Sequence, residues 1–207
     1  QIRNSVCYPK LNVKVAATHA GLTVGEDGAS HQAIEDVSLM RSLPNMTVLV
    51  PADEEETRQA IAWAAEYQGP VYIRLGRMSV DAVSPEGYVF APAKAAVLTE
   101  GNDVTLIANG VMVTAALEAA KTLATEGIQA RVINMASVKP LDAAAVVSAA
   151  KETGAIVTCE EHSIIGGLGS AVAEVLAEQA PAPMERVGVK DTFGESGKPK
   201  ELLAKYG

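Results

Sequence analysis

The chain has 207 residues, of which 48% are hydrophobic and 4% aromatic, and its formal net charge is −8. The length allows one large domain or two small ones, and the composition predicts an aliphatic core of strands under alanine-rich helices. The acidic balance argues against nucleic acid as a partner, because phosphate binding needs clustered lysine and arginine. No apolar run reaches membrane-spanning length, and Cys7 and Cys159 match no metal or redox spacing, so we expect a soluble cytoplasmic protein with two free thiols.

The first part of the chain alternates short apolar runs with helical patterns. This strand–helix rhythm predicts parallel pairing through crossover helices. Acids gather in the first turn of the second helix, where the helix dipole favours them. The opening residues "QIRNSV" resemble the end of a helix already under way, so the first unit is expected to lack its beginning. The predicted strands are 12–18, 47–52 and 70–76, and the predicted helices are 30–44, with Ser30 as N-cap, and 53–67.

Residues 79–92 interrupt this rhythm with two prolines and no helical period. We therefore place a domain boundary there, with domains at 1–84 and 85–207. The predicted fold is α/β, as two α/β units with mainly parallel sheets. In the second unit we expect strands at 103–110, 130–135, 155–161 and 184–190, helices at 111–126, 141–152 and 167–179, and a short final helix.

The stretch "THAGLTVGEDGASHQ" (18–32) follows a predicted strand and leads into a helix, which is where open parallel sheets place ligands. His19, Asp27 and His31 offer titratable groups there, and three glycines allow unusual backbone dihedrals. A solvated connecting loop is the plain alternative. A metal site is a third, but a gap of twelve residues between the histidines fits no compact ligand spacing, and we predict no metal ligand in this cluster.

A second candidate is "EEHSIIGGLGSAVAEVL" (160–176), in which glycines mark a strand-to-helix junction. Such a turn can bind phosphate, but these residues lack the dinucleotide fingerprint. We interpret the glycines as a tight turn for helix–sheet packing. His162 is interpreted as a structurally satisfied histidine, with an interface or regulatory role as the alternative.

Long motifs in the chain resemble the transketolases. The segment "ATHAGLTVGEDGASHQAIEDVSLMRSLPNMTVLVPADEEE", with its G-E-D-G-x-x-H-Q core, and "YIRLGR" resemble the pyrimidine-binding domain of that family. "NMASVKPLD", "EEHSIIGGLGSA" and "SGKPKELL" resemble successive parts of the transketolase C-terminal domain. The matches run in order over nearly all of the chain, so the first unit is expected to be a partial thiamine-pyrimidine-binding domain.

The resemblance implies thiamine-diphosphate chemistry, in which a two-carbon ketol unit moves from a ketose phosphate to an aldose phosphate and the cofactor serves as electron sink. It implies a place in the pentose phosphate pathway. His19 would lie in the substrate channel, and Asp27 would accept a hydrogen bond from a substrate hydroxyl. His31 would exchange a hydroxyl proton, and Arg77 would clamp the phosphate, while Arg74 is expected to form a structural ion pair. His31 also falls in the first turn of predicted helix 30–44, whose positive end favours a neutral ring.

The family's cofactor site needs a glutamate and flanking aromatic residues that would precede residue 1, and a separate domain that holds the diphosphate and Mg²⁺. No Gly-Asp-Gly metal motif of that domain occurs here. We therefore expect the isolated chain to be inactive and to bind no cofactor. The implied assembly is a split transketolase in which this chain belongs to the C-terminal subunit, with the diphosphate-binding half as partner, in a homo-oligomer built on a dimer.

Three alternatives stay open. 1-Deoxy-xylulose-5-phosphate synthase shares the G-E-D-G-x-T-H-Q core, but its usual lead-in is D-R-A-G where this chain has "THAG", and G-x-F-D usually follows where this chain has "AIED". The β subunit of a 2-oxo acid dehydrogenase fits less well, because its loop normally lacks the two histidines. From another class, the chain could be a non-catalytic assembly or regulatory module on the same fold.

Overall fold

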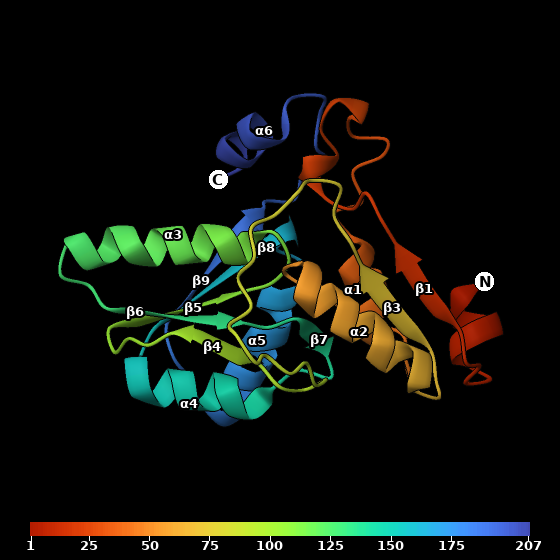
Figure 1. Cartoon of the computed structure of the whole chain (residues 1–207), viewed down its shortest axis with the longest axis horizontal. Helices are drawn as coiled ribbons and strands as arrows, with labels where there is room; N and C mark the ends of the chain where they lie inside the picture. The colour runs from red at the N-terminus through yellow and green to blue at the C-terminus, as the bar shows by residue number, and fades with distance from the viewer.

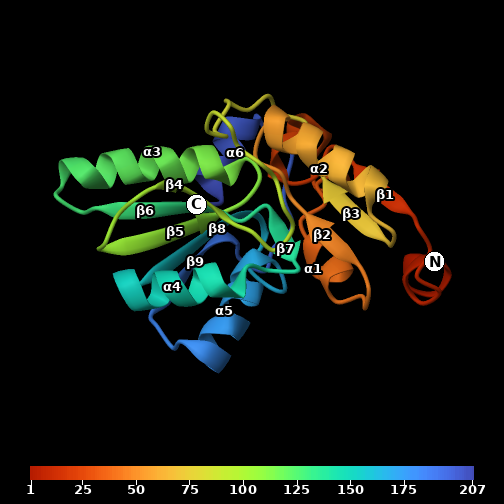
Figure 2. The same ribbon diagram turned by 60° about the horizontal axis from the view of Figure 1, so that its bottom comes forward.

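The computed structural model describes residues 1–207 and contains two β-sheets with helices on both faces of each (Figure 1). The first sheet is covered by α2 on one face and by α1 on the other (Figure 2). Its strand order is β1-β3-β2-β7, with β1 at Lys14–Ala17, β2 at Thr47–Leu49, β3 at Val71–Arg74 and β7 at Ser137–Lys139, and its helices are α1 (Asp36–Arg41) and α2 (Glu54–Glu66).

The second sheet lies between α3 on one face and α4 with α5 on the other (Figures 1 and 2). Aliphatic side chains fill both of its faces, with Ile107, Ile133 and Val172 on the α4–α5 side. Its strand order is β4-β6-β5-β8-β9, with β4 at Ala96–Thr99, β5 at Val104–Ala108, β6 at Ala130–Asn134, β8 at Ile156–Ser163 and β9 at Met184–Val189. Its helices are α3 (Met112–Thr125), α4 (Ala143–Thr153) and α5 (Leu168–Gln179).

The predicted fold class is confirmed, because five of the seven strand pairs are parallel and join through crossover helices. The two antiparallel pairs, β2–β7 and β4–β6, involve strands that were not predicted. β7 has three residues and β4 lies before the strand–helix rhythm resumes, so neither carries a periodic signal of useful length. Three short helices complete the chain: η1 (Ile2–Cys7), η2 (Leu22–Asp27) and α6 (Pro199–Lys205).

The two units share structure across the predicted boundary. β7 belongs to the second half of the sequence but pairs with β2 in the first sheet. Glu56, in the first turn of α2, is fully buried and accepts two hydrogen bonds of 2.9 Å from the amide of Asn134 at the end of β6. The division at residue 84 stays a prediction, and the pairing of β7 with β2 shows that the first sheet is not built from the first half of the chain alone.

None of the helices combines the length and the apolar character needed to cross a membrane.

Candidate functional site

Residues 18–31 leave the carboxyl end of β1 and turn back toward α1 across the edge of the first sheet. Backbone hydrogen bonds join this loop to the end of β3, from Ala20 N to Leu75 O (3.2 Å) and from Leu75 N to Ala17 O (2.8 Å). Positive φ angles recur along the loop, at His19 (64°) and at three glycines. Parallel pairing therefore brings this loop beside the residues that follow β3, including Arg77.

Arg77 and Asp27 meet at this edge. Arg77 Nη1 donates to the Val24 carbonyl (2.8 Å) and lies 3.3 Å from Asp27 Oδ2. The two side chains are 45% and 50% exposed, so water screens the pair and it can rearrange when a ligand arrives. The remaining guanidinium nitrogens have no acceptor in the protein and face solvent, which leaves donors for a second anion.

Both histidines of the loop are exposed, and each ring uses only one nitrogen in the protein. His19 Nδ1 lies 2.9 Å from the Thr18 hydroxyl, and His31 Nδ1 lies 2.9 Å from the Ser30 hydroxyl. The Nε2 atoms have no protein partner and are free to contact a substrate.

The prediction that His31 lies in the first turn of a helix beginning at Ser30 is wrong. α1 begins only at Asp36, and the His31 N–H instead closes a turn onto the Gly28 carbonyl (3.0 Å). Residues 28–34 stay non-helical because Gln32 is buried and donates to loop carbonyls, and because Ile34 packs against the C-terminal segment. The helix-dipole argument for a neutral His31 ring therefore no longer applies.

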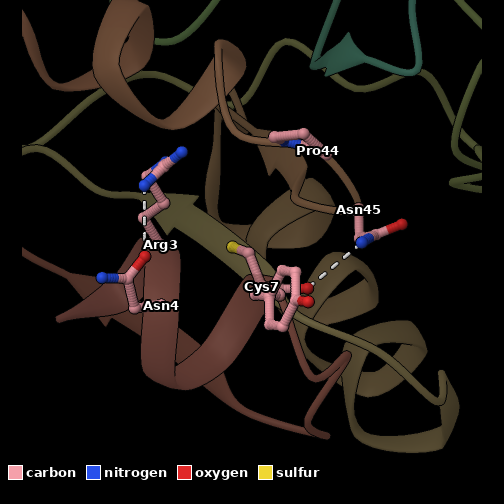
Figure 3. A pocket seen from close by; sticks show the side chains of 6 residues that line it. Arg3, Asn4, Cys7, Pro44 and Asn45 are labelled. Atoms are coloured by element: carbon pink, nitrogen blue, oxygen red, sulfur yellow. Dashed lines mark hydrogen bonds between the residues drawn. The ribbon is translucent and has the colours of Figure 1, made fainter.

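A cavity of about 350 Å³ opens at the same edge, where ligands bind in open parallel sheets. Thr18, Leu75 and Gly76 line it, so the chain neighbours of His19 and Arg77 form part of its wall. A second cavity of about 460 Å³ lies elsewhere, between η1 and the turn after α1, around Cys7 and Asn45 (Figure 3). The four candidate residues, His19, Asp27, His31 and Arg77, line neither cavity, and only the first has their chain neighbours in its wall. No group of three or more His, Cys, Asp or Glu side chains is placed to hold a metal ion.

Comparison with known proteins assigns both units. Residues 1–82 match the family model of the transketolase pyrimidine-binding domain, and residues 93–207 match that of the transketolase C-terminal domain. The chain belongs to the transketolase family.

Three relatives are similar to this chain over its whole length. A solved structure described as a split-gene transketolase, an inactive β4 tetramer, has 61% identity and a TM-score of 0.93, and the match covers 100% of this chain and 66% of that one. The 6-deoxy-6-sulfo-D-fructose transketolase subunit SqwH of Clostridium sp. is 47% identical over 100% of the chain and 64% of its own length. The 1-deoxy-D-xylulose-5-phosphate synthase of Desulforudis audaxviator is 41% identical over 100% of the chain and 33% of its own length. The chain thus spans no more than about two thirds of these proteins.

Beneath the exposed loop of this transketolase-family chain lies a buried ionic group centred on Arg74. Arg74 Nε donates to Asp36 Oδ2 (2.9 Å), and Nη1 lies 3.9 Å from Glu161 Oε2. Nη2 donates to the carbonyls of Ala33 (3.0 Å) and Glu161 (2.8 Å). Burial acts to lower the pKa of Arg74, but the carboxylates of Asp36 and Glu161 outweigh it, and the pKa is raised. The expected structural ion pair of Arg74 is present, and it binds residues of both units.

Tyr72 and His162 complete this group. The Tyr72 hydroxyl donates to Asp36 Oδ2 (2.5 Å), and burial with the neighbouring carboxylate raises the pKa of Tyr72. His162 Nε2 accepts from the Ser38 N–H (3.3 Å), and Nδ1 donates to the Ser163 carbonyl (2.7 Å). Burial, with Arg74 nearby, lowers the pKa of His162, so the ring stays neutral and caps α1. The interpretation of His162 as structurally satisfied is confirmed.

Glu160, two residues before His162, accepts hydrogen bonds of 2.7 and 2.8 Å from two backbone N–H groups in the first turn of α5. Burial raises the pKa of Glu160 to about 7, although the two hydrogen bonds act to lower it. The glycine-rich turn of 160–176 is therefore closed by a protein carboxylate rather than left open for a phosphate, and the packing interpretation holds.

Two residues that shape the loop were not found from the sequence. Glu161 accepts a hydrogen bond of 2.5 Å from the Thr23 N–H, and Gln32 donates to the Leu22 carbonyl (3.2 Å). Nothing in the sequence pairs Glu161 with a loop 138 residues earlier. The apolar strand pattern around 156–163 is the one sequence signal for Glu161. A carboxylate within a buried strand needs a polar or charged partner.

The ionic group gives a stability prediction. Arg74→Ala leaves Asp36 and Glu161 buried without their cation, and we expect the free energy of unfolding of the full-length subunit to fall by about 3–5 kcal/mol in urea titration. Arg58→Ala is the matched control, because the Arg58–Glu55 pair is exposed and should leave the midpoint unchanged. Equal, small losses in the two variants would contradict a structural role for Arg74.

Proposed function

We propose that this chain is part of a thiamine-diphosphate-dependent transketolase that moves a two-carbon ketol unit from a ketose phosphate to an aldose phosphate. The observation that carries the proposal is that one loop carries His19, Asp27 and His31, all exposed, with Arg77 paired to Asp27 beside it. These residues lie at the carboxyl edge of a parallel sheet next to a cavity.

The chain matches the pyrimidine-binding and C-terminal domains of the family. The proposal therefore assigns the diphosphate and Mg²⁺ to a partner half of the enzyme. The relatives named as subunits of transketolases support a divided enzyme of this kind. We propose a homo-oligomeric assembly of the two halves.

Arg77 would bind the phosphate of the sugar through the guanidinium nitrogens that the protein leaves free. A planar guanidinium matches the geometry of tetrahedral oxyanions, and a hydrogen bond to Val24 O holds it in place. A sulfonate offers similar oxygen atoms, and a relative is named for a sulfo-sugar. The phosphate and the sulfonate are therefore both reasonable ligands for this position.

Asp27 would accept a hydrogen bond from a hydroxyl beside the reacting carbonyl, since an exposed carboxylate loosely paired with Arg77 can turn toward substrate. His31 would take and return the hydroxyl proton as the carbon–carbon bond breaks and forms, using its free Nε2. His19 would line the entrance to the site. Each assignment concerns a side chain that the loop leaves open to solvent.

The test is reconstitution. The full-length chain should be combined with a diphosphate-binding half of transketolase type, thiamine diphosphate and Mg²⁺, and assayed with xylulose 5-phosphate and ribose 5-phosphate. We expect ketol transfer that needs both polypeptides, and no activity or tight cofactor binding by the 207-residue chain alone in calorimetry. A parallel assay with pyruvate and glyceraldehyde 3-phosphate tests the synthase, a relative at 41% identity, which formation of 1-deoxy-xylulose 5-phosphate and CO₂ would favour. The absence of both activities would favour a non-catalytic module.

Removal of the Arg77 side chain should act on phosphorylated substrates. Arg77→Ala should raise the KM for phosphorylated sugars about ten- to hundredfold and change the KM for free sugars little, because a charge-assisted contact is lost. The control is Arg58→Ala, which removes an exposed arginine from α2 and should change neither KM. Equal damage with both kinds of sugar would mean that Arg77 acts through its hydrogen bond to Val24 and not on the phosphate.

His31 is tested by two substitutions in the reconstituted enzyme. His31→Ala should lower kcat by roughly 10²- to 10⁴-fold if the ring carries the proton. Glutamine keeps hydrogen-bonding capacity but exchanges no proton near neutral pH, so His31→Gln should be damaged to a similar extent. A glutamine variant with near-normal kcat would show that His31 orients the substrate and that the proton travels by another route.

A further inference from the structure

The segment that follows β9 folds over the loop that carries the candidate residues. Figure 1 shows α6 and the end of the chain beside the η2 region, although about 170 residues separate them in sequence. Leu22 of η2, Ile34, Val189 of β9 and Leu202 of α6 form one buried apolar cluster. The underside of the loop is therefore packed against the second unit.

Close backbone approaches complete this contact. Gly28 has a positive φ (75°), and a Cβ at this position would lie 2.5 Å from the Ser196 hydroxyl. A Cβ on Gly25 would lie 3.2 Å from the ring of Pro199. Gln32, buried inside the loop, donates to the Glu195 carbonyl (2.9 Å). The G-E-D-G core therefore has glycines where a Cβ would clash with Ser196 or make a tight contact with Pro199.

Glu161 supports the other side of the loop. Its Oε1 accepts the Thr23 N–H at 2.5 Å, and a Cβ on Gly21 would lie 2.3 Å from its carboxyl carbon. Burial raises the pKa of Glu161, while the Arg74 guanidinium acts to lower it. The carboxylate is thus held between a cation and the backbone of the loop.

The loop's internal bonds include those from the Gln32 amide to the Leu22 and Gly25 carbonyls (3.2 and 3.4 Å) and one from Gly21 N to Ala33 O (2.9 Å). Within it, the backbone bonds of η2 are weak or local, such as Val24 N to Gly21 O at 3.4 Å and Gly28 N to Gly25 O at 3.1 Å. His19 has a positive φ, which costs a non-glycine residue free energy unless the surroundings impose it. The contacts with Glu161 and with the C-terminal segment therefore add to the loop's own bonds in holding this conformation.

We infer that Glu161 and the segment 189–206 are positioning elements, through which the second unit sets the conformation of the loop that presents His19, Asp27 and His31. The catalytic meaning of this inference rests on the proposed function. The statement that the second unit holds the loop in its conformation does not rest on the proposed function, because it concerns the order of the loop itself.

The test measures amide hydrogen exchange in the full-length subunit. Leu202→Ala removes methyl groups from the cluster under η2, and exchange of peptides covering residues 19–33 should speed up by roughly thirtyfold or more. The matched control is Leu176→Ala, a leucine of α5 with equal burial (4% against 3% exposed) that packs in the core of the second sheet. The control should accelerate amide exchange around α5. It should leave the exchange rate of peptides covering residues 19–33 as it is in the wild type.

Two variants at Glu161 separate shape from charge. Glu161→Gln keeps one oxygen to accept the Thr23 N–H, and should preserve the protection of the loop better than Glu161→Ala does. If these variants lower the stability of the subunit, the ratio of loop exchange to core exchange still reports local opening. Unchanged loop exchange in Leu202→Ala, or uniform acceleration through the whole second unit, would overturn the inference.

Activity supplies a second readout. In the reconstituted enzyme, Leu202→Ala and Glu161→Ala should lower kcat for ketol transfer more than Leu176→Ala does, and Glu161→Gln should recover part of the loss. If the wild-type assembly transfers no ketol unit, the proposed function fails, while the exchange data still decide whether the second unit holds the loop.

Discussion

The buried guanidinium of Arg74 is the contact on which the arrangement of the two units depends. It neutralises Asp36, at the start of α1, and Glu161, in the last part of β8, and it also binds the carbonyls of Ala33 and Glu161. An arginine with this many buried partners costs free energy to desolvate, and that cost is offset only when every partner is in place. The ion group therefore fixes how the first helix, the third strand and the second sheet meet.

The same group connects the scaffold to the candidate site. Asp36 is held at the start of α1, and His162 caps that helix, so the chain between the loop and α1 has a fixed end point. Glu161, held by Arg74, then contacts the backbone of η2. Buried charge thus supports a loop whose own candidate side chains, His19, Asp27 and His31, are exposed.

This division separates rigid backbone from adaptable side chains. Thr23, Val24 and Gly25 are buried, whereas His19, Asp27, His31 and Arg77 lie at the surface. Sites work best when the backbone that carries them is set by packing and by a second layer of hydrogen bonds. The weakly coupled Asp27–Arg77 pair can exchange its partners at little cost, while the Arg74 pairs cannot.

The sequence by itself determined the local elements and the family. The helix predicted at 111–126 occurs at Met112–Thr125, and the strand predicted at 103–110 occurs at Val104–Ala108, because hydrophobic period and capping act over neighbouring residues. The motifs around 18–32 also placed His19, Asp27 and His31 on one connection between a strand and a helix. Only the tertiary structure decided the start of α1, the pairing of β7 with β2, and the contacts of Glu161 with Thr23 and of Gln32 with Glu195. These depend on packing between residues more than 80 positions apart, and no local pattern in the chain specifies which distant surface a segment will meet.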